Sequence, residues 1–596
     1  MLFKAVRFSK TALLAQYVLS IIVLSIFWTS FSSIHGLGVS TTRPLLTDRP
    51  DVDRRPPPSI PVDSVHISDT EAGLIELSAQ HFIDYPLQKP YTNRFGELGG
   101  RVQVLRRWIE LSEEATPGQP TDRVVESVEA VIASTFPFLV KDQASTTPLA
   151  DLRRSFTEPR GIVIPTGSKT FRFACHLIVS LRQVFKTTLP IQVVYAGDAD
   201  LPKAKRDALL SLASFGTEGG DVEHSEISFL DVMDVFDDST LKLAYGGWAI
   251  KIFAALASKF SEVILLDADA VFFQDPIALL KQKSYQDNGA LFFHDRLLWQ
   301  YDFKERHQWW HSQVVHEGPN LNKSLVWTQT YAEEQDSGVV VVDKSRLDVL
   351  LGLLHVAWQN TRDVREETTY KMTYGDKEAW WFGLELANAT YAFEKHYGGI
   401  VGWGRSRAQL KTTGNTTTPS EPPEKVCSFV ISHVDESDNL LWFNGGLLKN
   451  KITNKREFEV PTHWMMDADW EKGANKPDMS CMKHGTAMEL TGAEKETIRQ
   501  SIEGAQMTAQ GLPESLGSSS SDIIVFKWFA RSYGVHREQR HNCLARSGSS
   551  SGGRDPQTVD LLQGLFDNGL AGSRNAAEPE CRIKVCQAIL RILTYA

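Results

Sequence analysis

The chain has 596 residues, of which 42% are hydrophobic and 23% charged, and its formal net charge is −10. The acidic balance argues against nucleic acid as the main ligand. The length allows one large domain with accessory segments and is too great for a single small module.

The first pattern along the chain is an uncharged, apolar stretch at residues 11–33. It follows Lys4, Arg7 and Lys10, and it is about long enough for one membrane-spanning helix. The positive-inside rule therefore places residues 1–10 in the cytosol and the remainder in a lumen. A cleaved signal peptide is the alternative, but the stretch exceeds a usual h-region and no A-x-A site follows it. We expect a single-pass signal anchor.

Two accessory regions precede the main domain. Residues 34–100 are assigned to a stem, because residues 43–61 are rich in Pro, Asp and Arg and favour an extended chain. Apolar residues at helical spacing and a Thr-Asp cap predict helices over 101–114 and 121–138. We interpret residues 101–155 as a helical neck.

Residues 156–485 are assigned to the main domain, and from residue 161 to about 451 strand-like and helix-like segments alternate. The predicted strands are 161–164, 191–195, 263–267, 290–294 and 338–343, and the predicted helices are 171–185, 203–214, 248–260, 346–358 and 378–387. This alternation predicts an α/β fold, a Rossmann-like, mostly parallel sheet flanked by helices. Residues 486–596 are expected to be a partly disordered C-terminal extension, because Gly/Ser-rich runs occur at 517–521 and 547–553.

Sequons and cysteines agree with a lumenal main domain. Sequons occur at Asn322, Asn388 and Asn415. Six cysteines follow the anchor, and an oxidising lumen would permit disulfides whose connectivity one sequence does not reveal. None of them forms a C-x-x-C pair, which argues against a zinc ribbon.

The most informative motif is Asp267-Ala-Asp269, which directly follows the buried-strand pattern Val263–Leu266. Ligands of α/β sheets bind at the carboxyl ends of strands, and two hard oxygen donors there suit a divalent cation shared with phosphates. The same spacing occurs at Asp198/Asp200 and Asp467/Asp469. We interpret those two pairs as turn or cap residues, since the first follows Gly197 and the second has no clear strand before it.

Further motifs follow one another in a fixed order. They are Gly161–Gly167, Trp248-Ala-Ile-Lys251, Glu334–Ser345, Tyr374-Gly-Asp-Lys-Glu-Ala-Trp-Trp-Phe-Gly383, Ser432-His-Val-Asp435 and Leu441–Lys451. In this order they resemble the fungal Golgi mannosyltransferases that extend mannan and glycoprotein glycans, over roughly residues 161–451. The Gly-Asp-Lys-Glu and Trp-Trp-Phe-Gly segments are more similar to the α-1,3-mannosyltransferase branch than to the α-1,2 branch.

The resemblance implies a type II Golgi membrane enzyme with a GT-A fold. It implies GDP-mannose as the donor, Mn²⁺ as the cofactor, a mannose-terminated glycoprotein glycan as the acceptor, and transfer with retention of configuration. A complex with other Golgi glycosyltransferases would fit this setting. An α-1,2 linkage, another sugar nucleotide, and a membrane-anchored glycan-binding scaffold with a decayed site remain as alternatives.

Candidate ligands of the metal and donor come from several segments. Asp267 and Asp269 are predicted metal ligands, and His433 is a predicted third ligand, with a structural histidine as the alternative. The predicted donor-binding residues are Thr166, Gly167, Lys251, Asn444, Gly445, Gly446 and Lys449. For the lysines, Lys451 included, the alternative is a solvated surface position.

Asp336, Asp376 and Glu378 are the candidate catalytic carboxylates. A retaining transfer needs a carboxylate nucleophile or a front-side route assisted by the leaving diphosphate, and the sequence leaves both routes open. Asp376 precedes a predicted helix and would alternatively be its N-cap, with Glu378 in the first turn.

Overall fold

The computed structural model describes residues 65–141, 145–213, 227–405, 423–475 and 477–511. The predicted anchor at 11–33, the sequon at Asn415 and three of the cysteines lie outside these residues. Within them, no helix is both long and apolar enough to span a bilayer. Asn322 and Asn388 are both exposed.

Helices form the first part of the described chain. They are α2 (Asp69–Asp84), α3 (Phe95–Glu114), α4 (Gln119–Thr135) and α5 (Pro148–Arg154). The helices expected over 101–114 and 121–138 correspond to α3 and α4. Helix α2 and the start of α3 occupy residues 69–84 and 95–100, within the range 34–100 that was assigned to a stem. The prediction missed the Ser68–Glu71 capping box and the buried face of α2, both of which favour a helix.

Seven strands form the central sheet, in the order β3-β2-β1-β4-β7-β6-β8. Their bounds are β1 Glu158–Pro165, β2 Ile191–Tyr195, β3 Ile227–Asp231, β4 Phe260–Leu266, β6 Ala290–His294, β7 Gln335–Asp343 and β8 Ala392–Phe393. Pairing is parallel from β3 to β4 and between β6 and β8, and β7 runs antiparallel to both of its neighbours. This is the mixed, mostly parallel sheet that the alternation predicted.

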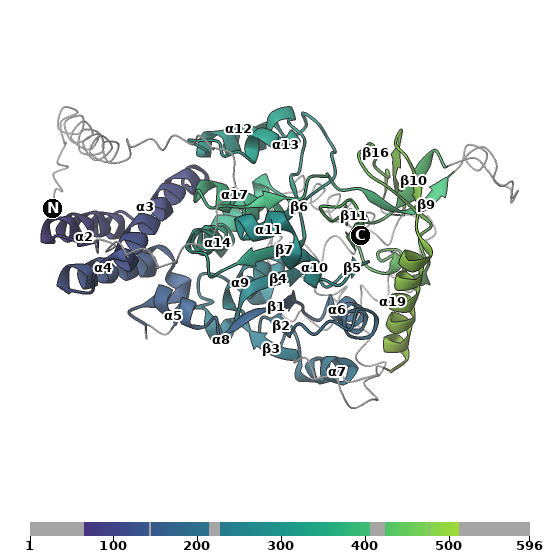
Figure 1. Cartoon of the computed structure of the whole chain (residues 1–596), viewed down its shortest axis with the longest axis horizontal. Helices are drawn as coiled ribbons and strands as arrows, with labels where there is room; N and C mark the ends of the chain where they lie inside the picture. Colours follow the sequence, from purple (N-terminus) through teal and green to yellow (C-terminus); the bar gives the residue numbers. More distant parts are fainter. Residues whose placement is uncertain (1–64, 142–144, 214–226, 406–422, 476, 512–596) are drawn as a thin grey trace, which may run out of the picture. The chain divides into compact units, whose positions relative to one another are not determined.

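Helices cover both faces of this sheet (Figure 1). Alternate residues along β4 show why: Val263 and Leu265 belong to one apolar cluster, and Ile264 and Leu266 belong to the other. The first cluster includes α9 (Ile250–Ala257), α14 (Leu347–Gln359) and α17 (Lys377–Leu386). The second includes α6 (Phe171–Val179), α7 (Lys203–Ala213), α10 (Ile277–Lys281) and α11 (Lys283–Asn288). Shorter helices lie in the connections: α8 (Val232–Val235), α12 (Lys304–Gln313), α13 (Leu325–Gln329), α15 (Arg362–Val364) and α16 (Tyr370–Met372).

Smaller sheets follow in the later part of the chain. One has the order β11-β12-β5, with β5 Ala270–Phe272, β11 Ile431–Val434 and β12 Leu440–Asn444. A second contains β16 Asp469–Glu471, β17 Ser480–Lys483, β10 Lys425–Ser428, β9 Ile400–Arg405, β15 His463–Met465 and β18 Met488–Glu489. Strands β13 (Leu448–Asn450) and β14 (Asn454–Phe458) form a hairpin. The Cys427–Cys481 disulfide joins β10 to β17.

Helix α19 (Gly492–Gly511) contacts α6 and the π-helical turn Ser180–Val184 that continues it (Figure 1). Ser501 Oγ and Ser180 Oγ form a buried hydrogen bond of 2.9 Å between them. The ordered body therefore continues past residue 485, where the sequence placed the end of the main domain. The polar composition of this helix hid its packing role, because only a few of its residues, such as Ile498 and Ile502, are buried.

Candidate functional site

Asp267 and Asp269 lie directly after the carboxyl end of β4, as the sequence predicted. The Asp267 amide donates to the Gly338 carbonyl of β7 at 2.8 Å, and the Ala270 amide donates to the Asp267 carbonyl at 3.0 Å. The first bond continues the ladder between two central strands, and the second closes the turn into β5. The pair therefore stands on a rigid part of the sheet.

The side chain of Lys251, in α9, contacts Asp267 from within the protein core. Its buried Nζ lies 3.0 Å from Asp267 Oδ1 and 3.3 Å from Asp376 Oδ2, and it donates to the Ser337 carbonyl and hydroxyl oxygens at 2.9 Å each. Burial opposes its charge, but the attraction of Asp267 and Asp376 raises the pKa of Lys251 on balance. Burial also raises the pKa of Asp267, and although Lys251 opposes this, repulsion from Asp269 and Asp376 adds to it.

Lys451 supplies a second positive charge, through an ion pair with Asp269. The same segment brings Gly445, whose amide donates to the Asp269 carbonyl at 3.3 Å. Gly446 has φ +82°, and a Cβ built there would lie 3.6 Å from the Asp269 Cβ. We call Lys251, Asp267, Asp269, Asp376 and Lys451 the carboxylate–lysine cluster.

Asp336 of β7 joins His433 and Asn444, which are distant in sequence. His433 Nε2 lies 3.2 Å from Asp336 Oδ2, and Asn444 Nδ2 donates to Asp336 Oδ1 at 2.7 Å. Burial opposes ionisation, but the hydrogen bond from His433, the charge of Lys377 and the Gly338 amide hold the pKa of Asp336 well below its usual range. Asp336 is therefore a carboxylate that orients two other candidate residues.

The carboxylates of Asp376 and Glu378 have different partners although the two residues are only two positions apart. Asp376 stands at the N-terminus of α17 without capping it through its side chain. Its carboxylate instead contacts Lys251 and accepts from Trp380 Nε1 at 2.9 Å. Glu378 accepts from Trp381 Nε1 at 2.6 Å and from the Glu334 amide at 3.1 Å, and burial raises its pKa to about 8. The structure brings Asp376 to the cluster and turns Glu378 into the core.

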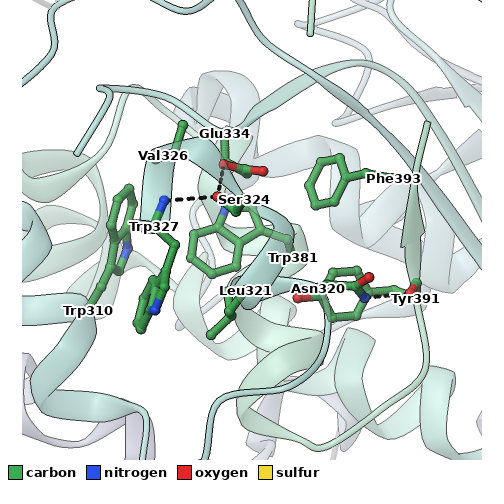
Figure 2. Close-up of a pocket in the computed structure, with 10 residues that line it drawn as sticks. All are labelled: Trp310, Asn320, Leu321, Ser324, Val326, Trp327, Glu334, Trp381, Tyr391 and Phe393. Atoms are coloured by element: carbon green, nitrogen blue, oxygen red, sulfur yellow. Dashed lines mark hydrogen bonds between the residues drawn. The ribbon is translucent and has the colours of Figure 1, made fainter. Parts of the chain in front are cut away.

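Glu334 and Trp381, which both bond to Glu378, line a cavity (Figure 2). Its polar groups bond to one another: Ser324 Oγ donates to Glu334 at 2.5 Å, and Asn320 Nδ2 donates to the Tyr391 carbonyl at 2.7 Å. Trp310, Trp327 and Trp381 form its walls and are buried. The cavity is a packing space of the core.

Other predicted donor-binding residues lie apart from the cluster. Lys449 forms ion pairs with Glu457 (2.9 Å) and Glu459 (2.5 Å) on the neighbouring strand and beyond it. Thr166 and Gly167 follow β1 at the same edge of the sheet as Asp267, where Thr166 Oγ1 bonds to Thr170 Oγ1 at 2.8 Å. A Cβ at Gly167 would lie 2.1 Å from Asp200 Oδ1, so this glycine permits close packing of the Asp200 carboxylate.

Asp198 and Asp200 have local partners, as expected of turn residues, whereas Asp467 follows β15 and contacts a histidine 71 residues away, and Asp469 is the first residue of β16. Asp198 pairs with Arg206 at 2.5 Å, and Asp200 accepts from the Ala196 amide at 3.2 Å. Asp467 and Asp469 each lie 2.8 Å from a histidine, His396 and His484 respectively.

The sequence analysis missed a second charged group, next to Asp336. Lys377 of the Gly-Asp-Lys-Glu motif forms an ion pair with Asp295, at the end of β6, and lies 3.6 Å from Glu333. The signal available was the position of Asp295, which follows a predicted strand as Asp267 does. Lys451 was also underrated, because the spacing of the two lysines alone does not tell which of them faces the site.

The arrangement of the candidate ligands Asp267, Asp269 and His433 bears on whether the implied metal ion fits. Among the described residues, no group of three or more His, Cys, Asp and Glu side chains is arranged to hold a metal. His433 is engaged with Asp336 and is not grouped with Asp267 and Asp269, so the three-ligand site remains a prediction. The two carboxylates themselves suit a divalent cation in chemistry, because their mutual repulsion would be relieved by a positive ion.

Residues 159–435 match the family model described as "Mannosyltransferase putative". Alpha-1,3-mannosyltransferase MNN1 of Saccharomyces cerevisiae is 28% identical over 353 residues, covering 52% of this chain and 43% of that protein. Alpha-1,3-mannosyltransferase MNT3 of the same organism is 28% identical over 301 residues, covering 46% of this chain and 44% of that protein. The predicted resemblance to fungal α-1,3-mannosyltransferases is confirmed.

The chain spans less than half of the length of these relatives. Among solved structures, the mannosyltransferase Ktr4p of S. cerevisiae aligns with a TM-score of 0.25 and 13% identity, over 54% of this chain and 84% of that one.

Proposed function

We propose that this chain is a glycosyltransferase that moves mannose from GDP-mannose to a mannose-terminated glycan, forming an α-1,3 linkage with retention. The observation that carries the proposal is the family match over 159–435, which contains the rigidly held Asp267/Asp269 pair at the end of β4. The names of the relatives favour the α-1,3 linkage over the α-1,2 alternative. The sheet order from β3 to β4, with candidate residues at the carboxyl ends of β1 and β4, supports a GT-A-type nucleotide-sugar site.

The metal in this proposal is Mn²⁺, held by Asp267 and Asp269, with His433 as the proposed third ligand. When bound, it would act as a Lewis acid that neutralises charge on the departing diphosphate. The charges of Lys251 and Lys451, which form ion pairs with Asp267 and Asp269 respectively, favour binding of the anionic donor. Gly446 lines a small cavity together with Asp269, whereas a Cβ at Gly445 would lie 2.6 Å from Val430 Cγ1, so Gly445 serves the packing of this segment.

The engaged state of the candidate catalytic carboxylates supports the front-side route. Asp336 is bonded to His433 and Asn444, Asp376 to Lys251 and Trp380, and Glu378 to Trp381. A covalent route needs a carboxylate that can leave such partners to attack the sugar. In our proposal Asp336 orients Asn444 and His433, and Asp376 holds Lys251 in place.

The proposed setting is the Golgi membrane, with residues 11–33 as a type II anchor and the main domain in the lumen. The exposed sequons at Asn322 and Asn388 support this orientation. Partners in this setting would be glycoprotein glycans and other Golgi glycosyltransferases. Glycan attachment at either asparagine in cells agrees with it, and protease digestion of the main domain in sealed, cytosol-facing vesicles would contradict it.

The activity is tested with the purified full-length chain. We expect release of GDP from GDP-mannose that requires Mn²⁺ and is lost with EDTA, and an α-1,3-linked product by linkage analysis. Asp269→Asn should lower the rate by more than about 100-fold, because the diphosphate loses its anchor. Asp198→Asn, the matched carboxylate outside the site, should stay within roughly twofold of the wild type. Neither binding nor hydrolysis of the donor by the wild type would favour the scaffold alternative.

A further inference from the structure

Two exposed aromatic side chains, Trp248 and Tyr374, lie together beside the carboxylate–lysine cluster. They are 49% and 61% exposed, and their ring centroids are 5.4 Å apart. Trp310, Trp380, Trp381 and Trp442 are by contrast fully or almost fully buried. Trp380 and Trp381 of the motif are therefore core residues, and the aromatic surface near the site is a different pair.

The backbone holds this aromatic pair in one arrangement. Gly375 has φ +69°, and a Cβ there would come within 2.8 Å of Cε3 of Trp248, so only glycine lets the indole lie against the turn. Thr373 Oγ1 donates to the Gly375 carbonyl at 3.1 Å and to the Thr369 carbonyl at 2.8 Å. An aromatic surface fixed in this way loses little conformational entropy when a ligand binds.

Both members of the pair belong to segments that also build the cluster. Trp248 lies in the turn before α9, which carries Lys251, and Tyr374 lies two residues before Asp376. Lys251 Nζ and Asp376 Oδ2 are 3.3 Å apart, so the two segments meet below the pair. Lys377 Nζ lies 5.9 Å from the centroid of the Tyr374 ring. The aromatic surface is thus continuous with the charged groups of the site.

We propose that Trp248 and Tyr374 form the platform on which a pyranose of the acceptor glycan stacks. This inference rests on the proposed function and adds the acceptor subsite to it. A pyranose has C–H groups on its faces and hydroxyl groups around its edge, so it matches an aromatic surface bordered by polar side chains. Lys377, whose Nζ lies 5.9 Å from the centroid of the Tyr374 ring, and Glu333, which lies 3.6 Å from Lys377, supply a donor and an acceptor for those hydroxyls.

The test separates the acceptor from the donor. GDP release from GDP-mannose is measured first without acceptor, and transfer is then measured against increasing α-mannobiose. For Trp248→Ala and for Tyr374→Ala, we expect unchanged donor hydrolysis and a KM for α-mannobiose that rises roughly 5- to 10-fold, with Trp248→Phe intermediate. Tyr85→Ala, which removes a 63% exposed tyrosine after α2, should leave both quantities unchanged.

Each outcome decides between definite alternatives. An unchanged KM in both alanine variants overturns the platform and leaves the proposed function standing; it would be the result if the pair served a protein or a lipid surface. Loss of donor hydrolysis in a variant whose melting temperature is unchanged also overturns it, because the residue would then act on the donor. Absence of donor hydrolysis in the wild type refutes the proposed function itself. If one alanine variant does not fold, the other still decides.

Discussion

Lys251 Nζ puts a buried positive charge between two carboxylates of the cluster, Asp267 and Asp376. A buried lysine is tolerated only where its charge and its donors are satisfied, and the oxygens of Ser337 complete that set. Its hydrogen bonds fix the spacing of carboxylates that would otherwise repel each other. Lys251 therefore links the side chains of Asp267 and Asp376 to each other.

Lys251→Met should abolish donor hydrolysis and destabilise the fold by about 3–5 kcal/mol, because two carboxylates lose their buried counter-charge. Urea unfolding and Mn²⁺-dependent GDP release measure the two effects. The double variant Lys251→Met/Asp376→Asn should recover part of the stability without recovering activity. Equal stability of the single variant and the wild type would show that the buried pairs contribute nothing.

Lys449 and Lys451 offer a matched comparison two residues apart. Lys451→Ala should raise the KM for GDP-mannose roughly tenfold, because Asp269 loses its partner and the donor loses a positive charge. Lys449→Ala removes only ion pairs with Glu457 and Glu459 and should leave this KM unchanged. The reverse result would mean that the sequence interpretation, which chose Lys449, was right.

At the scale of elements, the sequence predicted those strands and helices whose apolar pattern is continuous along the chain. The apolar run before Asp267 is continuous, so β4 and the placing of its carboxylates could be predicted. Strand β3 was missed because every residue of it is only partly buried, and β8 has only two residues. The contact of His433 with Asp336 joins positions 97 residues apart, and no spacing rule reaches that far. The side-chain direction of Lys451 likewise depends on the β13–β14 hairpin, in whose turn it lies.

The turn before α17 is an element whose geometry controls the site. Gly375→Ala should destabilise the fold by more than about 1 kcal/mol, since a positive φ and contact with Trp248 both oppose a methyl group. Gly247→Ala is the control: Gly247 also has positive φ (+58°), but no atom lies within 4 Å of the place that a Cβ would take there. It should show the backbone effect alone. Equal effects in urea unfolding would show that the Trp248 contact is not tight.

At the scale of the whole molecule, His396 connects three loops. Its Nε2 lies 2.9 Å from Asp438 after β11, and its Nδ1 lies 2.8 Å from Asp467 after β15. Lys395 and Glu394 are the other charged groups beside it. Both ring nitrogens must carry a proton to donate to both carboxylates. Burial opposes that charge, but the hydrogen bonds to Asp467 and Asp438 and the charge of Glu394 raise the pKa of His396 on balance.

Because the pKa of His396 is raised on folding, its contribution to stability is complete below its unfolded pKa of about 6.5 and disappears as pH rises through the folded value. Burial raises the pKa of Glu394 to about 7, so the ionisation of Glu394 also lowers stability as pH rises. The melting temperature of His396→Asn should therefore fall below that of the wild type at pH 6 and approach it at pH 8.5. A constant difference across this range would contradict the assignment. His484→Asn, at an exposed histidine–aspartate pair, is the matched control.

Strand β12 lies between β5, which follows the Asp267/Asp269 turn, and β11, which carries His433. The family match ends at residue 435, before β12 begins. A recombinant fragment cut at that boundary would keep Asp267, Asp269 and His433. It would lose β12, which hydrogen-bonds to both β5 and β11. Two unpaired strand edges would then face water and tend to associate with other chains. A minimal fragment for expression should therefore retain β12 and extend through α19, which covers α6.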